Sequence, residues 1–177
     1  CVSYDPTYAY ELAVIVQDGL RRMYSEQENV FYYVTCMNEN YAHPPMPKGA
    51  EHGILRGMYL LHVGGRGAVR VTLLGSGTIL REVQAAAELL EAEFGLPADV
   101  YSVTSFSELR RDALASEREA MLHPERKKAR KPWVSECLAG REGPFVAATD
   151  YMKTVADQIR QWVPGRYVAL GTDGFGR

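Results

Sequence analysis

The sequence has little cysteine, no long apolar run and no excess of charge of one sign. Its three cysteines, Cys1, Cys36 and Cys137, are odd in number and far apart, without a C-x-x-C pair. This pattern argues against a disulfide framework or a zinc site and favours a reducing compartment, so we expect a cytoplasmic protein. No apolar run approaches the ~20 residues that span a bilayer, so we expect no membrane partner. The formal charge of −2 gives no electrostatic reason to expect nucleic acid.

Motifs that usually carry chemistry are also missing. No His-x-x-x-His or Glu-x-x-His spacing occurs, so we expect no metal site, and no G-x-S-x-G elbow is present. Cys36 and Cys137 lie in apolar segments and are interpreted as core residues. The one basic run, residues 126–131, lies between two prolines and is interpreted as a solvated loop. We therefore predict no catalytic, cofactor-binding or metal-binding residue in this chain.

A strand-to-helix turn at residues 74–78, LGSGT, comes nearest to a ligand-binding motif. Free backbone N–H groups and the positive end of a helix dipole suit such a turn to anions. A dinucleotide fingerprint needs a third glycine where this chain has Leu80, and the lysine of a phosphate loop is absent. We interpret Gly75 and Gly77 as structural residues whose backbone angles or close contacts exclude a side chain. An anion site remains the alternative.

The N-terminal part of the chain predicts a helix, a strand and a linker. Asp5-Pro6 is a good helix start, and apolar residues then recur with a 3.6-residue period to about Tyr24. Residues 30–37, VFYYVTCM, are rich in β-branched and aromatic types and predict a buried strand. Residues 38–49 contain three prolines, which forbid regular structure, so this stretch is the best candidate for an interdomain linker.

Asn38, Glu39 and Asn40 form the most interesting polar cluster, because they follow the predicted buried strand directly. Ligands of open α/β sheets gather at the carboxyl ends of strands. We therefore select these three as possible substrate-channel residues. The alternative is an ordinary polar exit from the strand into the linker.

Strand and helix patterns alternate after the linker. The expected strands are residues 69–74, 100–103, 145–148 and 167–170. The expected helices are residues 78–94, a helix that starts at the capping box Ser105–Glu108, residues 133–138, and a helix from Asp150 to about Val163. The buried stripe of the first helix is expected on or near Ala85, Ala86, Leu89 and Leu90. Such alternation predicts an α/β fold, with a mostly parallel sheet covered by helices on both faces.

The two ends of the sequence predict a piece of a larger protein. The chain begins at Cys1 without an initiator methionine and ends just after a glycine-rich turn, residues 171–176. A strand-like run leads into that turn, and in α/β folds the next segment is usually a helix that packs on the sheet. The chemistry of the parent protein therefore need not lie in these residues.

Six motifs, in this order along the chain, resemble one known family. They are CVSYDPTYAYELAVIVQDG at residues 1–19, NENY at 38–41, LLGSG at 73–77, DVYSVTSF at 99–106, ATDYMK at 148–153 and GTDGFG at 171–176. The family that they resemble is the homodimeric bacterial pyruvate dehydrogenase, the thiamine-diphosphate-dependent decarboxylating component of the pyruvate dehydrogenase complex. The resemblance spans essentially the whole chain.

The resemblance implies a transketolase-like architecture of three domains: a diphosphate-binding domain, a pyrimidine-binding domain and a C-terminal domain. Residues 1–46 would be the last helix and strand of the pyrimidine-binding domain with its linker, and residues 47–177 a truncated C-terminal domain. The parent would decarboxylate pyruvate with thiamine diphosphate and magnesium. It would pass the acetyl unit to the lipoyl group of its partner, the dihydrolipoyl acetyltransferase component, and act as a homodimer.

The same resemblance places the catalytic machinery elsewhere. The family's Gly-Asp-Gly magnesium and diphosphate motif, its cofactor-activating glutamate and its active-site histidines have no matching positions here. His43 lies at a variable position of the family pattern and receives no catalytic role. We therefore expect this fragment to supply assembly and domain scaffold and to bind no cofactor alone. Two alternatives remain, another transketolase-type 2-oxoacid dehydrogenase or a non-catalytic α/β module that binds an anion or serves in assembly.

Overall fold

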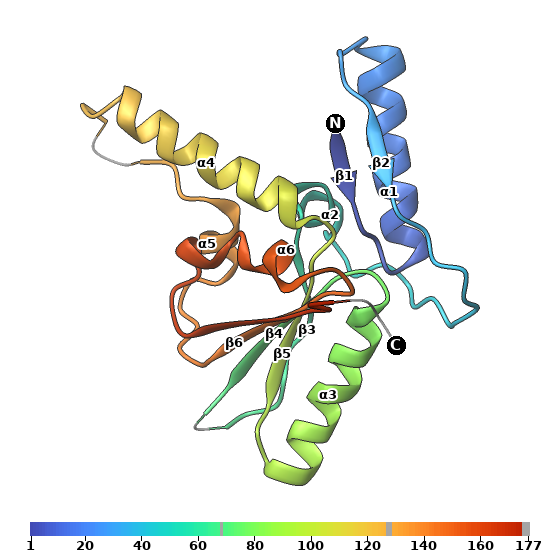
Figure 1. Cartoon of the computed structure of the whole chain (residues 1–177), viewed down its shortest axis with the longest axis vertical. Helices are drawn as coiled ribbons and strands as arrows, with labels where there is room; N and C mark the ends of the chain where they lie inside the picture. The colour runs from blue at the N-terminus through green and yellow to red at the C-terminus, as the bar shows by residue number, and fades with distance from the viewer. Residues whose placement is uncertain (68, 127–128, 175–177) are drawn as a thin grey trace.

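A five-stranded sheet lies at the centre of the computed structural model, which describes residues 1–67, 69–126 and 129–174 (Figure 1). The strand order is β3-β5-β4-β6-β7. The strands are β3 (Tyr59–His62), β4 (Val71–Gly75), β5 (Ala98–Ser102), β6 (Phe145–Ala148) and β7 (Tyr167–Leu170). β3 runs antiparallel to β5, and the other neighbouring pairs are parallel. The predicted mostly parallel sheet is confirmed.

Helices cover both faces of this sheet. In Figure 1, α3 (Ile79–Phe94) lies below it, and α4 (Phe106–Leu122), α5 (Trp133–Cys137) and α6 (Lys153–Asp157) lie above it. Successive side chains of a strand point to opposite faces, so Leu73 packs with Leu80 of α3 while Leu74 packs with Leu109 of α4. Every residue of β4 is buried, as expected of a parallel strand covered on both sides. The fold class is α/β, as predicted.

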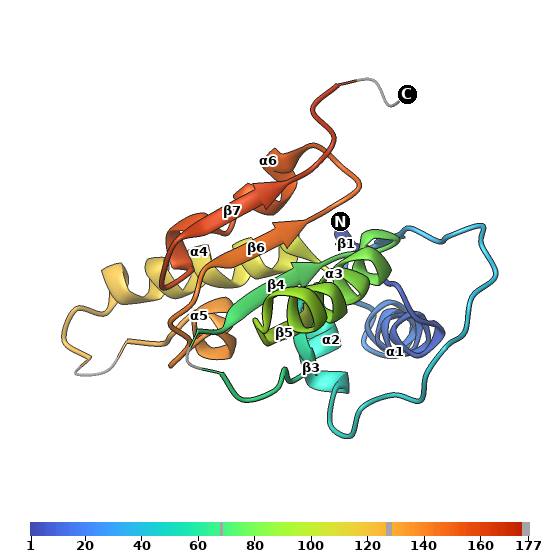
Figure 2. The ribbon, with the colours of Figure 1, turned by 90° about the horizontal axis from the view of Figure 1, so that it is seen from below.

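A smaller unit of two strands and one helix precedes the sheet. β1 (Val2–Tyr4) and β2 (Tyr32–Val34) pair in parallel. They are connected by α1 (Ala9–Leu20), which Figure 2 shows nearly end-on, and by the π-helical turn η1 (Arg21–Ser25). One core cluster joins this unit to α2 (Glu51–Arg56) and β3 through Val2, Tyr4, Ile15, Ile54 and Tyr59. The two units therefore share buried apolar contacts.

Helix α1 begins at Ala9 and not at Asp5-Pro6 as predicted. The chain is still extended at Asp5, whose N–H donates to the Thr104 carbonyl at 2.7 Å. The cap comes instead from the Glu11 side chain, which accepts hydrogen bonds from two N–H groups just before the helix. The predicted end near Tyr24 is confirmed, because helical turns continue through Ser25.

The buried strand predicted at residues 30–37 is wrong in both length and burial. β2 covers only Tyr32–Val34, and the side chains of Phe31 and Tyr33 are 63% and 61% exposed. Within the described residues β2 has a single strand neighbour, β1, and α1 covers only one side of this pair. The reading of Cys36 as a core residue is wrong for the same reason, since it lies exposed beyond the end of β2.

The segment predicted as a linker, residues 38–49, is irregular as expected. The sequence analysis did not predict the two elements that follow it. No helix or strand occurs between residues 35 and 47, all of them described. α2 and β3 come next, and β3 returns antiparallel along the sheet edge. α2 ends at Gly57, which has a φ of 100° and lies so close to α4 that a Cβ would come within 2.6 Å of the Ser105 carbonyl oxygen.

Helix α3 has the predicted bounds but not the predicted buried stripe. It ends at Gly95 in the left-handed conformation. Its buried residues are Leu80, Val83 and Ala87, at the spacing that faces β4, with Leu90 half-buried at the end of the same row. The stripe is wrong at three positions, because Ala85, Ala86 and Leu89 lie on the outer side of the helix.

The helix predicted from Asp150 to Val163 is shorter and starts later. α6 begins at Lys153 with Met152 as its N-cap, and a 3-10 turn, η2 (Arg160–Trp162), follows it. The other predicted elements of this region are confirmed within one to three residues. Among the described residues, no helix combines the length and the hydropathy needed to cross a bilayer.

Candidate functional site

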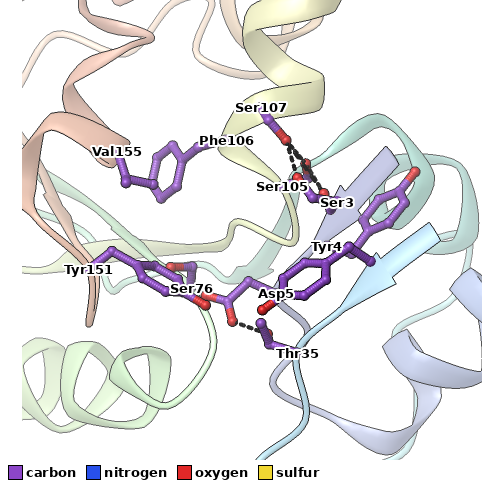
Figure 3. A pocket seen from close by; sticks show the side chains of 11 residues that line it. Ser3, Tyr4, Asp5, Thr35, Ser76, Ser105, Phe106, Ser107, Tyr151 and Val155 are labelled. Carbon is purple, nitrogen blue, oxygen red and sulfur yellow. Dashed lines mark hydrogen bonds between the residues drawn. The ribbon is translucent and has the colours of Figure 1, made fainter. Parts of the chain in front are cut away.

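The carboxyl ends of strands from both sheets meet at one place. Asp5 follows β1, Thr35 follows β2, Ser76 follows β4, Ser105 comes after β5 and Tyr151 after β6. All five line a pocket of about 220 Å³ (Figure 3). Ligands of open α/β sheets gather at such ends, so this pocket is the candidate functional site of the described chain.

Asp5 lies at the floor of this pocket, against the first turn of α3. Its carboxylate accepts a hydrogen bond from the Thr35 hydroxyl, and its backbone carbonyl accepts from Gly77 N–H at 3.1 Å. Burial raises the pKa of Asp5, while hydrogen bonds from Thr35 and Ser76 act in the opposite direction. The positive end of the α3 dipole favours a carboxylate here. The Asp5 carboxylate therefore lies against the turn at residues 74–78 that was the alternative anion site.

The structural reading of Gly75 and Gly77 is confirmed by geometry. A Cβ on Gly75 would lie 2.8 Å from the Leu80 Cα atom, because α3 packs directly on the turn. Gly77 has a φ of 50°, and a Cβ there would lie 2.7 Å from both carboxylate oxygens of Asp5. Only glycine leaves room for these two close approaches.

Replacing Gly75 or Gly77 with valine is expected to lower the free energy of unfolding by about 1–3 kcal/mol. Gly75→Val must displace α3, and Gly77→Val must both hold a strained φ and displace Asp5. Urea titration followed by circular dichroism measures the change, with Gly174→Ala as a control at an open position. An unchanged midpoint for both valine variants would contradict the structural reading.

A row of hydroxyl groups ties β1 to the start of α4. One half of the predicted capping box is confirmed, since Ser105 Oγ accepts from Glu108 N–H at 3.0 Å, whereas Ser105 N–H donates to the Gly57 carbonyl. The same hydroxyl donates to the Ser3 carbonyl at 2.6 Å, and the Ser3 and Ser107 hydroxyls lie 2.7 Å apart. These contacts fix one wall of the pocket.

Glu11 makes a fully buried polar connection between the two units, which the sequence analysis did not predict. The side chain is fully buried. Its carboxylate accepts hydrogen bonds from Thr7 N–H at 2.6 Å and Tyr8 N–H at 2.9 Å, both at the start of α1. It also accepts from the Tyr59 hydroxyl of β3 at 2.7 Å and the Ser102 hydroxyl of β5 at 2.6 Å. One carboxylate thus caps α1 and fixes it to the large sheet.

The predicted channel residues Asn38, Glu39 and Asn40 do not line the pocket at Asp5. All three are exposed on the irregular segment after β2. Glu39 forms an ion pair of 2.9 Å with Arg81 of α3, whose guanidinium lies over the Tyr41 ring. Glu39 also lines a smaller hollow of about 190 Å³ beside the start of α1. Their role in a substrate channel stays a prediction.

The other residues considered in the sequence do not form a site with these. His43 accepts a hydrogen bond from Ala9 N–H at 3.1 Å and lies beside Tyr41. Burial raises the pKa of the Cys137 thiol to about 12, which agrees with a core role and not with a nucleophile. Part of the basic run (127–128) and the end of the glycine-rich turn (175–176) lie outside the described residues.

The described residues also contain no obvious metal centre. No three side chains of His, Cys, Asp or Glu come together among them in a way that could hold a metal ion. A buried carboxylate does occur at the opposite edge of the sheet, where Asp99 pairs with Arg70 and Arg141. Both of its oxygens are thereby engaged by arginine, so this group holds loops together.

This α/β domain, with a smaller strand–helix–strand unit before it, fits the transketolase-like fold class expected from the sequence. The comparison with protein families agrees. The chain belongs to the family of the transketolase-like TK C-terminal domain, whose model matches residues 57–177. The model of the pyruvate dehydrogenase E1 component middle domain matches residues 1–44.

Curated relatives confirm the resemblance to bacterial pyruvate dehydrogenase. The chain is 62% identical to the pyruvate dehydrogenase E1 component of Pseudomonas aeruginosa and 55% identical to those of Cupriavidus necator and Escherichia coli (strain K12). Each alignment covers the whole of this chain and 20% of the relative. The chain thus spans about one fifth of the length of the relatives it matches.

Proposed function

We propose that this chain is part of a thiamine-diphosphate-dependent pyruvate dehydrogenase and supplies its scaffold, not its catalytic centre. The observation that carries this is the identity of 62% over the whole chain to a pyruvate dehydrogenase E1 component. The parent decarboxylates pyruvate and transfers the acetyl unit to the lipoyl group of a dihydrolipoyl acetyltransferase. It is a cytoplasmic homodimer with neither nucleic acid nor membrane among its partners.

The residues present do not fit thiamine diphosphate and magnesium. A diphosphate needs free backbone N–H groups or cations, and the strand-to-helix turn that could offer them already holds the Asp5 carboxylate. No cluster of three metal-ligating side chains lies within the described ranges. When bound elsewhere in the parent, the cofactor supplies the electron sink for the carbanion. We derive no step of that chemistry from these residues.

The scaffold role rests on the contacts between the two units. We propose a boundary near Met46, with residues 1–46 as the end of the pyrimidine-binding domain and residues 47–177 as the C-terminal domain. The Glu11 carboxylate and the backbone hydrogen bonds of Asp5 both cross this boundary. Buried polar contacts of this kind need defined geometry, so they fix the orientation of the two units.

The isolated chain is expected to release no carbon dioxide from pyruvate. Neither a metal-ligating cluster nor a diphosphate-binding turn is available among its described residues. Purified chain, supplied with thiamine diphosphate and magnesium, is assayed with carboxyl-labelled pyruvate. Cofactor-dependent release above the protein-free rate would contradict the scaffold assignment.

Within the parent, Asn38, Glu39 and Asn40 are proposed to approach the substrate channel. Glu39→Gln in the full-length enzyme should then change KM or kcat for pyruvate or the lipoyl acceptor by roughly threefold or more. Arg81→Gln is the matched control, because it breaks the same ion pair and leaves the Glu39 charge in place.

Equal effects of Glu39→Gln and Arg81→Gln would show that the ion pair only holds the segment after β2. Unchanged kinetic constants for both variants would make the cluster an ordinary strand exit. Only a change confined to the Glu39 variant supports the channel.

A further inference from the structure

The pocket at Asp5 contains a negative charge without a cationic side chain to balance it. Asp5 is its one carboxylate, and no Lys, Arg or His is present on its described lining. The cations on neighbouring helices are engaged elsewhere, Lys153 with Asp173 and Arg111 with Glu108. The carboxylate therefore receives hydrogen bonds from hydroxyl groups but no ion pair among the described residues.

Four aromatic residues line the same pocket as this carboxylate. Within this chain, Tyr4 and Phe106 are each 4% exposed, while Tyr33 and Tyr151 are 61% and 42% exposed. Figure 3 shows the rings of Phe106 and Tyr151 on one side of the hollow, Tyr4 on the other and Asp5 between them. The four rings come from β1, β2, the start of α4 and the segment after β6.

This combination selects a cation with an apolar body. A cation within about 6 Å of an aromatic ring centroid is attracted by the negative face of the ring. The carboxylate adds a direct charge attraction, which strengthens as water is displaced from the pocket. An anion would be repelled by Asp5, and a neutral apolar ligand would remove water from the carboxylate without compensation.

We propose that the pocket at Asp5 binds a small organic cation, an alkylammonium group held by the Asp5 carboxylate and the surrounding aromatic rings. Its volume of about 220 Å³ is below that of a pocket for a drug-sized ligand, so it suits a head group or one side chain. The same chemistry is offered by a free quaternary amine and by a methylated lysine of a peptide.

The test compares choline with 3,3-dimethyl-1-butanol, its neutral analogue of nearly the same shape, by saturation-transfer NMR on the full-length protein. Choline is expected to bind with a dissociation constant on the order of 1 mM and the neutral analogue at least fivefold more weakly. A short peptide with one trimethyllysine, in the same assay, distinguishes the two sources. Equal binding of choline and the alcohol, or binding of neither cation, would overturn the proposal.

Two variants locate the binding. Asp5→Asn keeps the size of the side chain and removes its charge, and Tyr151→Leu removes one partly exposed ring. Each should weaken choline binding at least threefold. Leu170→Ala, at an exposed side chain outside the pocket, is the control and should leave binding unchanged. Choline binding that survives both pocket variants would place the ligand elsewhere and contradict the assignment.

Discussion

We expect the replacement of Glu11 with alanine to lower the free energy of unfolding by about 3–5 kcal/mol. Four buried donors lose their acceptor: the N–H groups of Thr7 and Tyr8 and the hydroxyls of Tyr59 and Ser102. Each buried donor without a partner costs roughly 1–3 kcal/mol, and relaxation recovers part of the sum. Chemical denaturation monitored by circular dichroism measures the loss.

Two controls separate the network from the charge. Glu11→Gln keeps one acceptor oxygen and the shape of the side chain. Its free energy of unfolding should therefore lie between those of the wild type and the alanine variant. Glu93→Ala removes an exposed carboxylate of α3 and should leave the midpoint unchanged. An alanine variant at position 11 as stable as the Glu93 variant would contradict the assigned network.

Asp99→Ala is expected to lower the free energy of unfolding by about 2–3 kcal/mol, because three donors lose a buried acceptor while Arg70 and Arg141 stay partly exposed to water. The Asp99 side chain is 2% exposed and accepts from Arg70, from Arg141 and from Gly64 N–H at 3.0 Å. Without it, the guanidinium groups of Arg70 and Arg141 lose the carboxylate that both contact. Thermal and urea unfolding measure the loss.

The matched control for Asp99 is Asp157→Ala, which breaks an exposed ion pair with Arg160. Exposed pairs contribute little, so this variant should unfold almost as the wild type does. Asp99→Asn keeps the shape and tests the charge. Similar stability of the Asp99 and Asp157 alanine variants would show that the buried pair is not needed to hold the loops at this edge.

The large sheet could be predicted from the sequence because its signals are local. β4 is a mostly apolar run that ends at a glycine, and Ser105 caps α4 from the residue next to it. β3 escaped prediction because it is a short edge strand that follows a proline-rich segment. Its place beside β5 depends on pairing over a long sequence separation.

The candidate pocket and the Glu11 network could not be predicted because their contacts are not local. Glu11 lies 91 positions from Ser102, and in a helical pattern it is an ordinary charged residue. In the sequence, Asp5 beside Pro6 predicts a helix cap, whereas in the fold its carboxylate lies against the turn at Gly77. The apolar period of α1 also did not identify its buried face. That face contains Glu11 and Asp18, while Val16 and Leu20 are about half exposed.

The most direct measurement of the proposed function is an activity assay on the full-length product of the gene that encodes this chain. With thiamine diphosphate and magnesium we expect carbon dioxide release from pyruvate, acetylation of a lipoyl domain, and a clear preference for pyruvate over 2-oxoglutarate. Omission of the cofactor should abolish the reaction. Full-length protein that binds thiamine diphosphate but prefers another 2-oxoacid, or that neither binds it nor decarboxylates pyruvate, would contradict the assignment to pyruvate dehydrogenase.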